Sequence, residues 1–138
     1  VEFGLIRSKA GVRLSSCLDS LRRGVAEIIE RTGPAAAAVE GGFYFRNVKT
    51  AMVLGQARGV VIAACAREGL DVYEYAPRRV KQGVVGYGSA GKEQVRRMVM
   101  SLLGLDREPP EDAGDALAIA ICHLNSRSRI AAVKPEPI

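Results

Sequence analysis

The stretch AAAAVE, residues 35–40, decides the fold class. It is short and apolar, it is bounded by Gly-Pro before it and Gly-Gly after it, and it follows a segment with helical spacing. A continuous apolar run of this length after a helix is typical of a strand buried in a parallel sheet. Its last residue, Glu40, stands at the carboxyl end of that strand, which is the edge where sites form in open parallel sheets.

Helical and strand patterns alternate on both sides of this strand. Apolar residues recur at helical spacing in residues 18–33, and residues 47–67 predict a long helix. VEFGLIRS (1–8) and DVYEYAP (71–77) predict two further strands. Three more helical segments are expected, at residues 78–85, 93–105 and 111–125. This alternation indicates an α/β fold with a mainly parallel sheet.

Length and composition are those of one globular domain. The chain has 138 residues, 48% of them hydrophobic and 25% charged, so one core can form without disulfides or metals. We expect a single domain over residues 1–125 and a basic, flexible tail over residues 126–138. No apolar run approaches the roughly 18 residues of a membrane span, so no membrane partner is expected. Three widely spaced cysteines without a C-x-x-C motif predict reduced thiols in a cytoplasmic protein.

The net charge of +5 is mild, but its placement is informative. Basic residues gather in three clusters: Arg78, Arg79 and Lys81; Lys92, Arg96 and Arg97; and Arg127, Arg129 and Lys134. Clusters of this kind favour nucleic acid as the partner, and an ordinary solvated surface is the alternative.

The glycine-rich stretch GVVGYGSAGKEQV, residues 83–95, matches two nucleotide-binding motifs by letter only. A dinucleotide loop leaves a strand directly, whereas here a predicted helix separates the strand from the glycines. A P-loop needs Ser or Thr after its lysine, whereas Glu93 follows Lys92. What remains is a glycine-rich turn, a helix N-terminus and a lysine, which suit a nucleic-acid phosphate, or simply a turn beside a solvated lysine.

Three acids could bind a cation. Glu40 ends a predicted buried strand, and Asp112 and Asp115 lie three residues apart on a predicted helix, so those two share a face. The alternatives are a strand that ends in solvent and helix-capping acids. Asp115 lies inside an apolar run, where an acid needs a partner. Carboxylates from separate elements suit magnesium or manganese, and two such ions can assist phosphodiester hydrolysis.

Three stretches share the order and spacing of motifs in one family: VEGGFYFRNVKTAMVLGQARGV (39–60), YEYAPRRVKQGVVGYGSAGKEQV (73–95) and DAGDALAIAICH (112–123). Over about residues 18–125 the chain resembles bacterial Holliday junction resolvases of the RuvC type. The resemblance implies an RNase H-like fold, with a mixed sheet flanked by helices. It also implies a homodimer that nicks both sides of a four-way DNA junction in recombination and repair, and a branch-migration motor complex as a further partner.

The resemblance also implies roles for single residues. Glu40, Asp112 and Asp115 match three of the four acids that hold two Mg²⁺ ions, for which Mn²⁺ can substitute. The DNA-binding set comprises Phe43, which matches an aromatic that stacks at the junction centre, together with Lys81, Lys92, Arg78 and Arg79.

The chain departs from the family pattern near its start. The family's first acid lies in an I-D-P-G motif upstream of a segment like VEFGLIRS, and a third strand with the pattern G-x-I-x-T precedes the first helix; neither is found here. A sequence that omits segments, a truncated product or a divergent inactive protein would each explain this, and the other motifs favour the first two. The alternatives to a resolvase are therefore a junction-binding protein impaired in catalysis and another RNase H-like nuclease.

Overall fold

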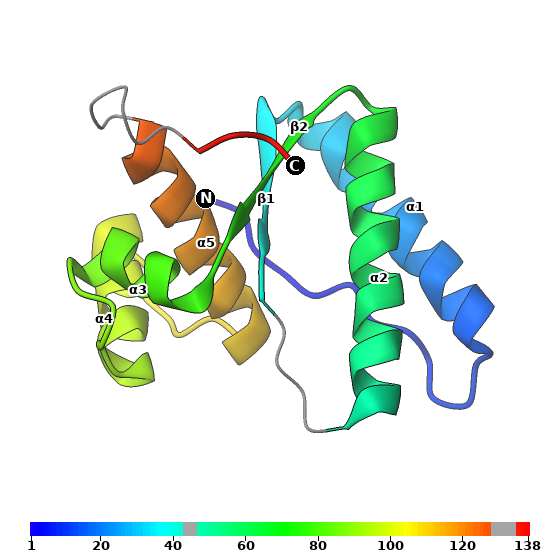
Figure 1. Cartoon of the computed structure of the whole chain (residues 1–138), viewed down its shortest axis with the longest axis horizontal. Coiled ribbons are helices and arrows are strands. Elements are labelled where there is room, and N and C mark those ends of the chain that lie inside the picture. The colour runs from blue at the N-terminus through cyan, green and yellow to red at the C-terminus, as the bar shows by residue number, and fades with distance from the viewer. Residues whose placement is uncertain (43–46, 128–134) are drawn as a thin grey trace. The chain divides into compact units, whose positions relative to one another are not determined.

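A computed structural model describes residues 1–42, 47–127 and 135–138, and of Arg127 it describes only the backbone. Along these residues, helix and strand alternate up to the third helix and two further helices follow, which confirms the predicted α/β class (Figure 1). The elements are α1 (Leu14–Thr32), β1 (Ala36–Glu40), α2 (Val48–Arg67), β2 (Asp71–Tyr75), α3 (Pro77–Val85), α4 (Lys92–Leu103) and α5 (Glu111–Arg127).

The two strands pair with each other, in the order β1-β2, and α2 connects them. The pair is parallel, as expected of a strand–helix–strand connection. The predicted strand at residues 1–8 is wrong, because the structure has no regular element there. Alternation of side chains is not enough to make a strand, which also needs a neighbour to complete its hydrogen bonds. Phe3 in this segment instead packs against a buried cluster.

The described residues divide into two compact units. Unit 1 contains residues 1–5, 38–42, 73–127 and 135–138, and unit 2 contains residues 6–37 and 47–72. Each strand begins in unit 2 and ends in unit 1, so the strand-end acid Glu40 belongs to unit 1 together with α3, α4 and α5.

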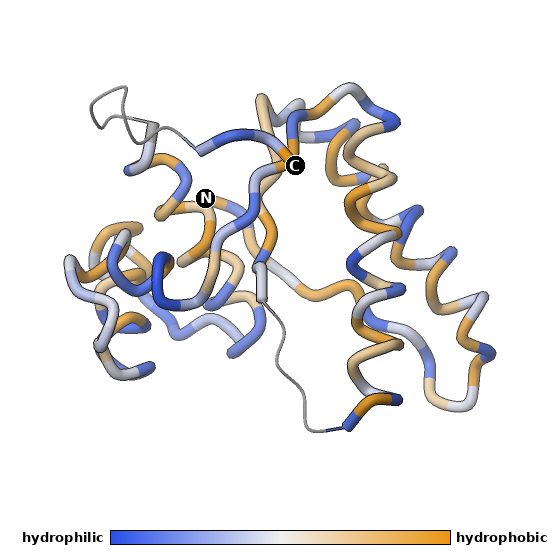
Figure 2. Tube along the Cα trace, in the orientation of Figure 1, coloured by the Kyte–Doolittle hydropathy of each residue, from blue (hydrophilic) through white to orange (hydrophobic). Residues whose placement is uncertain are grey.

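In unit 2, α1 packs against α2, and both helices carry mixed apolar and polar residues (Figure 2). The helix α1 begins at Leu14, four residues before the predicted start, and it ends where Gly33 adopts a left-handed conformation at φ 54°. Asn47 caps α2, since its side chain accepts a hydrogen bond from the Thr50 amide at 3.2 Å. The end of α1 and the start of α2 therefore lie at signals that the sequence carries.

Part of the apolar surface of α2 is exposed. Val48 and Met52 are 73% and 62% exposed, and Val53 and Leu54 are 37% exposed each. By length and composition alone, α2 also qualifies as a membrane-spanning helix, with a mean hydropathy of 1.3 over a window of which 11% is buried. One such helix is weak evidence for a membrane span. The exposed residues are equally those expected of a protein contact.

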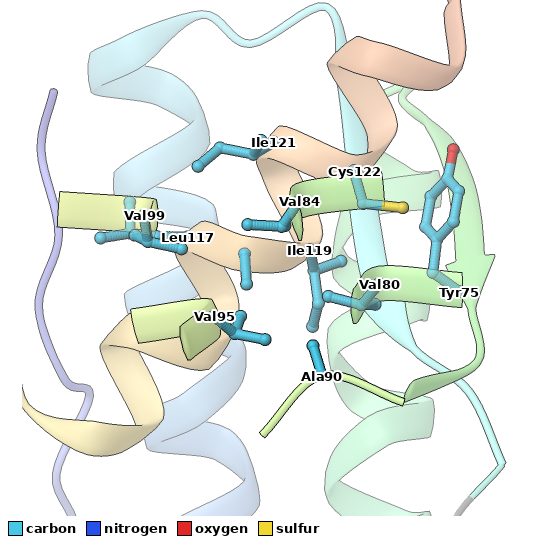
Figure 3. Close-up of a cluster of buried hydrophobic side chains, with 11 residues drawn as sticks. Tyr75, Val80, Val84, Ala90, Val95, Val99, Leu117, Ile119, Ile121 and Cys122 are labelled. Atoms are coloured by element: carbon cyan, nitrogen blue, oxygen red, sulfur yellow. The ribbon is translucent and has the colours of Figure 1, made fainter. Parts of the chain in front are cut away.

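Unit 1 has the main buried cluster, formed where α3 and α4 pack against α5 (Figure 3). Its members are Tyr75, Val80, Val84, Ala90, Val95, Val99, Leu117, Ala118, Ile119, Ile121 and Cys122. At Gly83, α3 packs tightly on α5. A Cβ at that position would lie 2.6 Å from Sγ of Cys122 and 3.1 Å from its Cα. This packing brings the side chains of three helices to the end of the sheet.

The glycine-rich stretch connects α3 to α4, so it leaves a helix and not a strand. Gly86 ends α3 at φ 99°, a conformation that favours glycine, and Gly91 precedes α4 as its N-cap residue. The structure thus confirms that the stretch lacks the context of a dinucleotide loop.

Candidate active site

The candidate site is built around Glu40, the last residue of β1. The next residue, Gly41, continues the pairing, since its amide donates a hydrogen bond to the Tyr75 carbonyl at 2.9 Å. The side chain of Glu74 occupies the space where a Cβ of Gly41 would be. A larger residue at this position would require the exposed Glu74 side chain to move, and the hydrogen bond to Tyr75 holds the end of the strand that carries Glu40.

Side chains from three helices meet Glu40 at one pocket. The pocket has a volume of about 220 Å³. Its charged lining residues are Glu40 from β1, Lys81 from α3, Lys92 from α4 and Asp115 from α5. Its walls are apolar, formed by Pro77, Val80, Val95, Ala118 and Ile119. Two carboxylates and two ammonium groups thus share one pocket in unit 1.

The two carboxylates influence each other. Burial raises the pKa of Glu40 above its ordinary value, the negative charge of Asp115 raises it further, and the positive charge of Lys92 lowers it. A divalent cation near both carboxylates would remove this repulsion, so Glu40 and Asp115 fit such an ion in donor type and in charge. However, residues 1–42, 47–127 and 135–138 contain no group of three or more Asp, Glu, His or Cys side chains placed to bind one metal ion.

Lys92 is the cation nearest to these acids. Its ammonium pairs with the carboxylate of Glu111 and lies 3.6 Å from Oδ2 of Asp115. The hydrogen bond to Glu111 and the charge of Asp115 raise the pKa of Lys92. Lys92 therefore stays charged at neutral pH.

The remaining predicted residues lie away from this pocket or outside the described residues. Asp112 is exposed in the first turn of α5 and does not line the pocket, so the structure does not join it to the other two acids. Arg78 and Arg79 lie in the first turn of α3 and do not line the pocket. The aliphatic part of the Arg78 side chain lies against Gly88. Phe43 lies outside the described residues.

Sequence reasoning missed the acidic partners of the second basic cluster. Arg96 pairs with Glu93 and Glu108, and Arg97 pairs with Glu93 at 3.0 Å. The spacing of Glu93 before both arginines, three and four residues, could have shown two of these pairs. The pairing of Lys92 with Glu111 could not be seen, since it joins two helices.

An α/β domain with two carboxylates and two lysines in one pocket at the end of a strand agrees with the RNase H-like fold that the resemblance implied. The chain belongs to the RuvC family: the model of the family described as "Crossover junction endodeoxyribonuclease RuvC" matches residues 1–123.

Relatives of the same description occur in several bacteria. The RuvC of Natranaerobius thermophilus is 47% identical over 121 residues, which are 87% of this chain and 75% of the relative. The RuvC of Moorella thermoacetica is 50% identical over 122 residues, 88% of this chain and 73% of the relative. Family membership supports a divalent-metal-dependent nuclease as the class of enzyme.

Solved structures agree with this assignment. The structure of Thermus thermophilus RuvC has a TM-score of 0.88 and 32% identity, and covers all of this chain and 82% of that one. The same protein in complex with a Holliday junction substrate has a TM-score of 0.91, with the same identity and coverage. The likeness confirms the predicted RNase H-like fold.

Proposed function

We propose that this protein is a structure-selective DNA endonuclease that resolves four-way junctions by paired, metal-dependent nicks in recombination and repair. The observation that carries the proposal is the pocket where Glu40 and Asp115 meet Lys81 and Lys92. Hydrolysis of a phosphodiester needs positive charge beside the phosphate and groups that help to activate water. In this pocket the lysines supply the positive charge, and the carboxylates can help to activate water, directly or through bound ions.

The metal ligands are part of the proposal. We propose that Glu40 and Asp115, which share the pocket, would hold Mg²⁺ together with Asp112, which precedes Asp115 by one turn of α5 and lies outside the pocket in the structure. Mn²⁺ could substitute, and each site would hold two ions. When bound, these ions supply activation of water and stabilisation of the leaving oxygen in phosphodiester hydrolysis. The lysines Lys81 and Lys92 bind the scissile phosphate, to which they bring two positive charges from different helices.

The DNA contacts beyond the pocket follow the basic surface of α3. Arg78 is exposed and lies one turn before Lys81 on this helix, so these two share a face and can follow one backbone. We propose a DNA contact for the half-buried Arg79 as well. We propose that Phe43 stacks on a base at the open centre of the junction, because it follows the strand-end acid by three residues.

Paired nicks call for two sites, which a homodimer supplies. The exposed apolar residues of α2 support a contact with a second copy, and Gly55 and Gly59 leave open space beside them for close approach. We further propose a branch-migration motor complex as a partner and the cytoplasm as the compartment. The three free cysteines, Cys17, Cys65 and Cys122, support a reducing compartment.

The proposal is tested with a labelled four-way junction and an equal-length duplex, with and without Mg²⁺ or Mn²⁺. The parent chain should nick the junction at symmetrical positions. Asp115→Asn should abolish nicking and spare junction binding, since it removes a ligand and leaves both lysines. Asp106→Asn, the same change at an exposed acid outside the pocket, serves as the control and should nick normally.

Three other outcomes would contradict the proposal in different ways. Junction-selective binding without nicks by the parent chain would favour an impaired junction-binding protein. Preference for an RNA–DNA hybrid over the junction in competition would favour another RNase H-like nuclease. Equal loss of binding and nicking in Asp115→Asn would indicate a folding defect and count against the metal-ligand role.

A further inference from the structure

Lys92 and Glu111 join the beginnings of two helices. Lys92 is the first residue of α4, and Glu111 is the first residue of α5. Their side chains form an ion pair, and Asp115, one helical turn after Glu111, faces the same ammonium at 3.6 Å. Two carboxylates of one helix therefore hold a cation of another.

The position of Lys92 is unfavourable for its own helix. The amino end of a helix carries a partial positive charge, so a cation in the first turn is repelled there, whereas an acid such as Glu111 is stabilised. The opposing carboxylates of α5 offset this repulsion. The Lys92 ammonium thus lies beside Glu111 and Asp115, whose negative charges favour that position.

Lys92 also stands between two hollows in unit 1. One is the pocket with Glu40 and Lys81, and the other is a groove of about 370 Å³ that includes Glu108 and Glu111. Lys92 and Asp115 line both. The side chain whose ammonium pairs with Glu111 thus also borders the pocket.

We propose that Glu111 is a positioning residue that holds the Lys92 ammonium in the DNA-free protein and competes for it with the DNA phosphate. This inference rests on the proposed function, in which Lys92 binds the scissile phosphate. A phosphate that enters the pocket must take the ammonium from Glu111, so part of its binding energy is used to break the ion pair. Removing the Glu111 carboxylate removes its share of this competition and leaves that of Asp115.

Glu111→Gln should therefore bind a four-way junction more tightly than the parent. An exposed ion pair of this kind corresponds to about a two- to fivefold change in affinity. The measurement is the dissociation constant by fluorescence anisotropy, in EDTA and at fixed ionic strength, so that neither metal binding nor cleavage contributes.

Glu108→Gln is the matched control, because it removes the same charge from the same groove but acts on Arg96. Each change is also made in a Lys92→Gln background. The effect of Glu111→Gln should vanish there, whereas any effect of Glu108→Gln should persist. A role of Glu111 in helix stability alone, or a general effect of net charge, would not depend on Lys92.

Three results would overturn the inference. Unchanged affinity of Glu111→Gln would mean that no competition exists, and an equal gain with and without Lys92 would mean that the effect is a general one of charge. If the parent does not bind the junction, the proposed function fails, and the inference fails with it. The first two results leave junction binding by the parent intact, so the two failures are distinguishable.

Discussion

Replacing Gly83 with alanine should destabilise the protein through the contact between α3 and α5. A methyl group there would lie 2.6 Å from Sγ, 3.0 Å from Cβ and 3.1 Å from Cα of Cys122. Cys122 is fully buried, and Asn125 donates a hydrogen bond to the Gly83 carbonyl at 2.9 Å. Neither a short buried side chain nor a helix backbone can move aside easily, so the two helices must separate.

The size of the effect follows from two opposing contributions. Overfilling a packed core typically costs about 1–3 kcal/mol. Alanine is a better helix former than glycine by about 1 kcal/mol, which offsets part of that cost. We expect a net loss on the order of 1–2 kcal/mol in the free energy of unfolding. Adding Cys122→Ala removes the contact with Sγ but also the hydrogen bond from Sγ to the Arg79 carbonyl at 3.5 Å, so it should restore only part of the loss.

Urea unfolding followed by circular dichroism measures this difference. Gly114→Ala is the control, because a methyl group there would meet its nearest neighbour, Cγ of Pro109, at an ordinary 3.6 Å. That change should stabilise α5 by about 0.5–1 kcal/mol. If Gly83→Ala were as stable as the parent while Gly114→Ala behaved as expected, the close packing of α3 on α5 would be refuted.

Two further predictions concern charge and association. Burial and then the Asp115 carboxylate raise the pKa of Glu40 in the folded state. Between the ordinary pKa of the unfolded state and this raised pKa, the folded state binds more protons than the unfolded state. The free energy of unfolding therefore falls as the pH rises through that window and Glu40 ionises. Glu40→Gln should therefore unfold at higher urea than the parent at pH 7 and lose this advantage below about pH 4; lower stability at pH 7 would contradict the shift. Met52→Asp, on the exposed face of α2, should be a monomer in sedimentation velocity. The control Leu102→Asp, at an exposed apolar residue of α4, should remain a dimer. Equal masses for the two variants would exclude α2 as the dimer contact.

Most elements could be predicted because their signals are local. The apolar run of 35–40 became β1 with Glu40 at its end, and the helical patterns became α1 to α5 within a few residues. Caps and stops such as Asn47, Gly33 and Gly86 act through bonds and backbone angles within one turn, so they can be read along the chain. The failed strand at residues 1–8 shows the limit, since pairing depends on a partner elsewhere.

By itself, the sequence determined the helices, the two paired strands and the chemical types of the site: strand-end and helical acids beside lysines. Only the tertiary structure decided which of these groups meet. Asp112 and Asp115 are near neighbours in sequence, yet Asp115 lines the pocket with Glu40 and Asp112 does not. Lys92 pairs with Glu111 across 19 residues. Such contacts arise from the docking of α4 on α5, which depends on the packing of the whole core rather than on the spacing of residues within one helix.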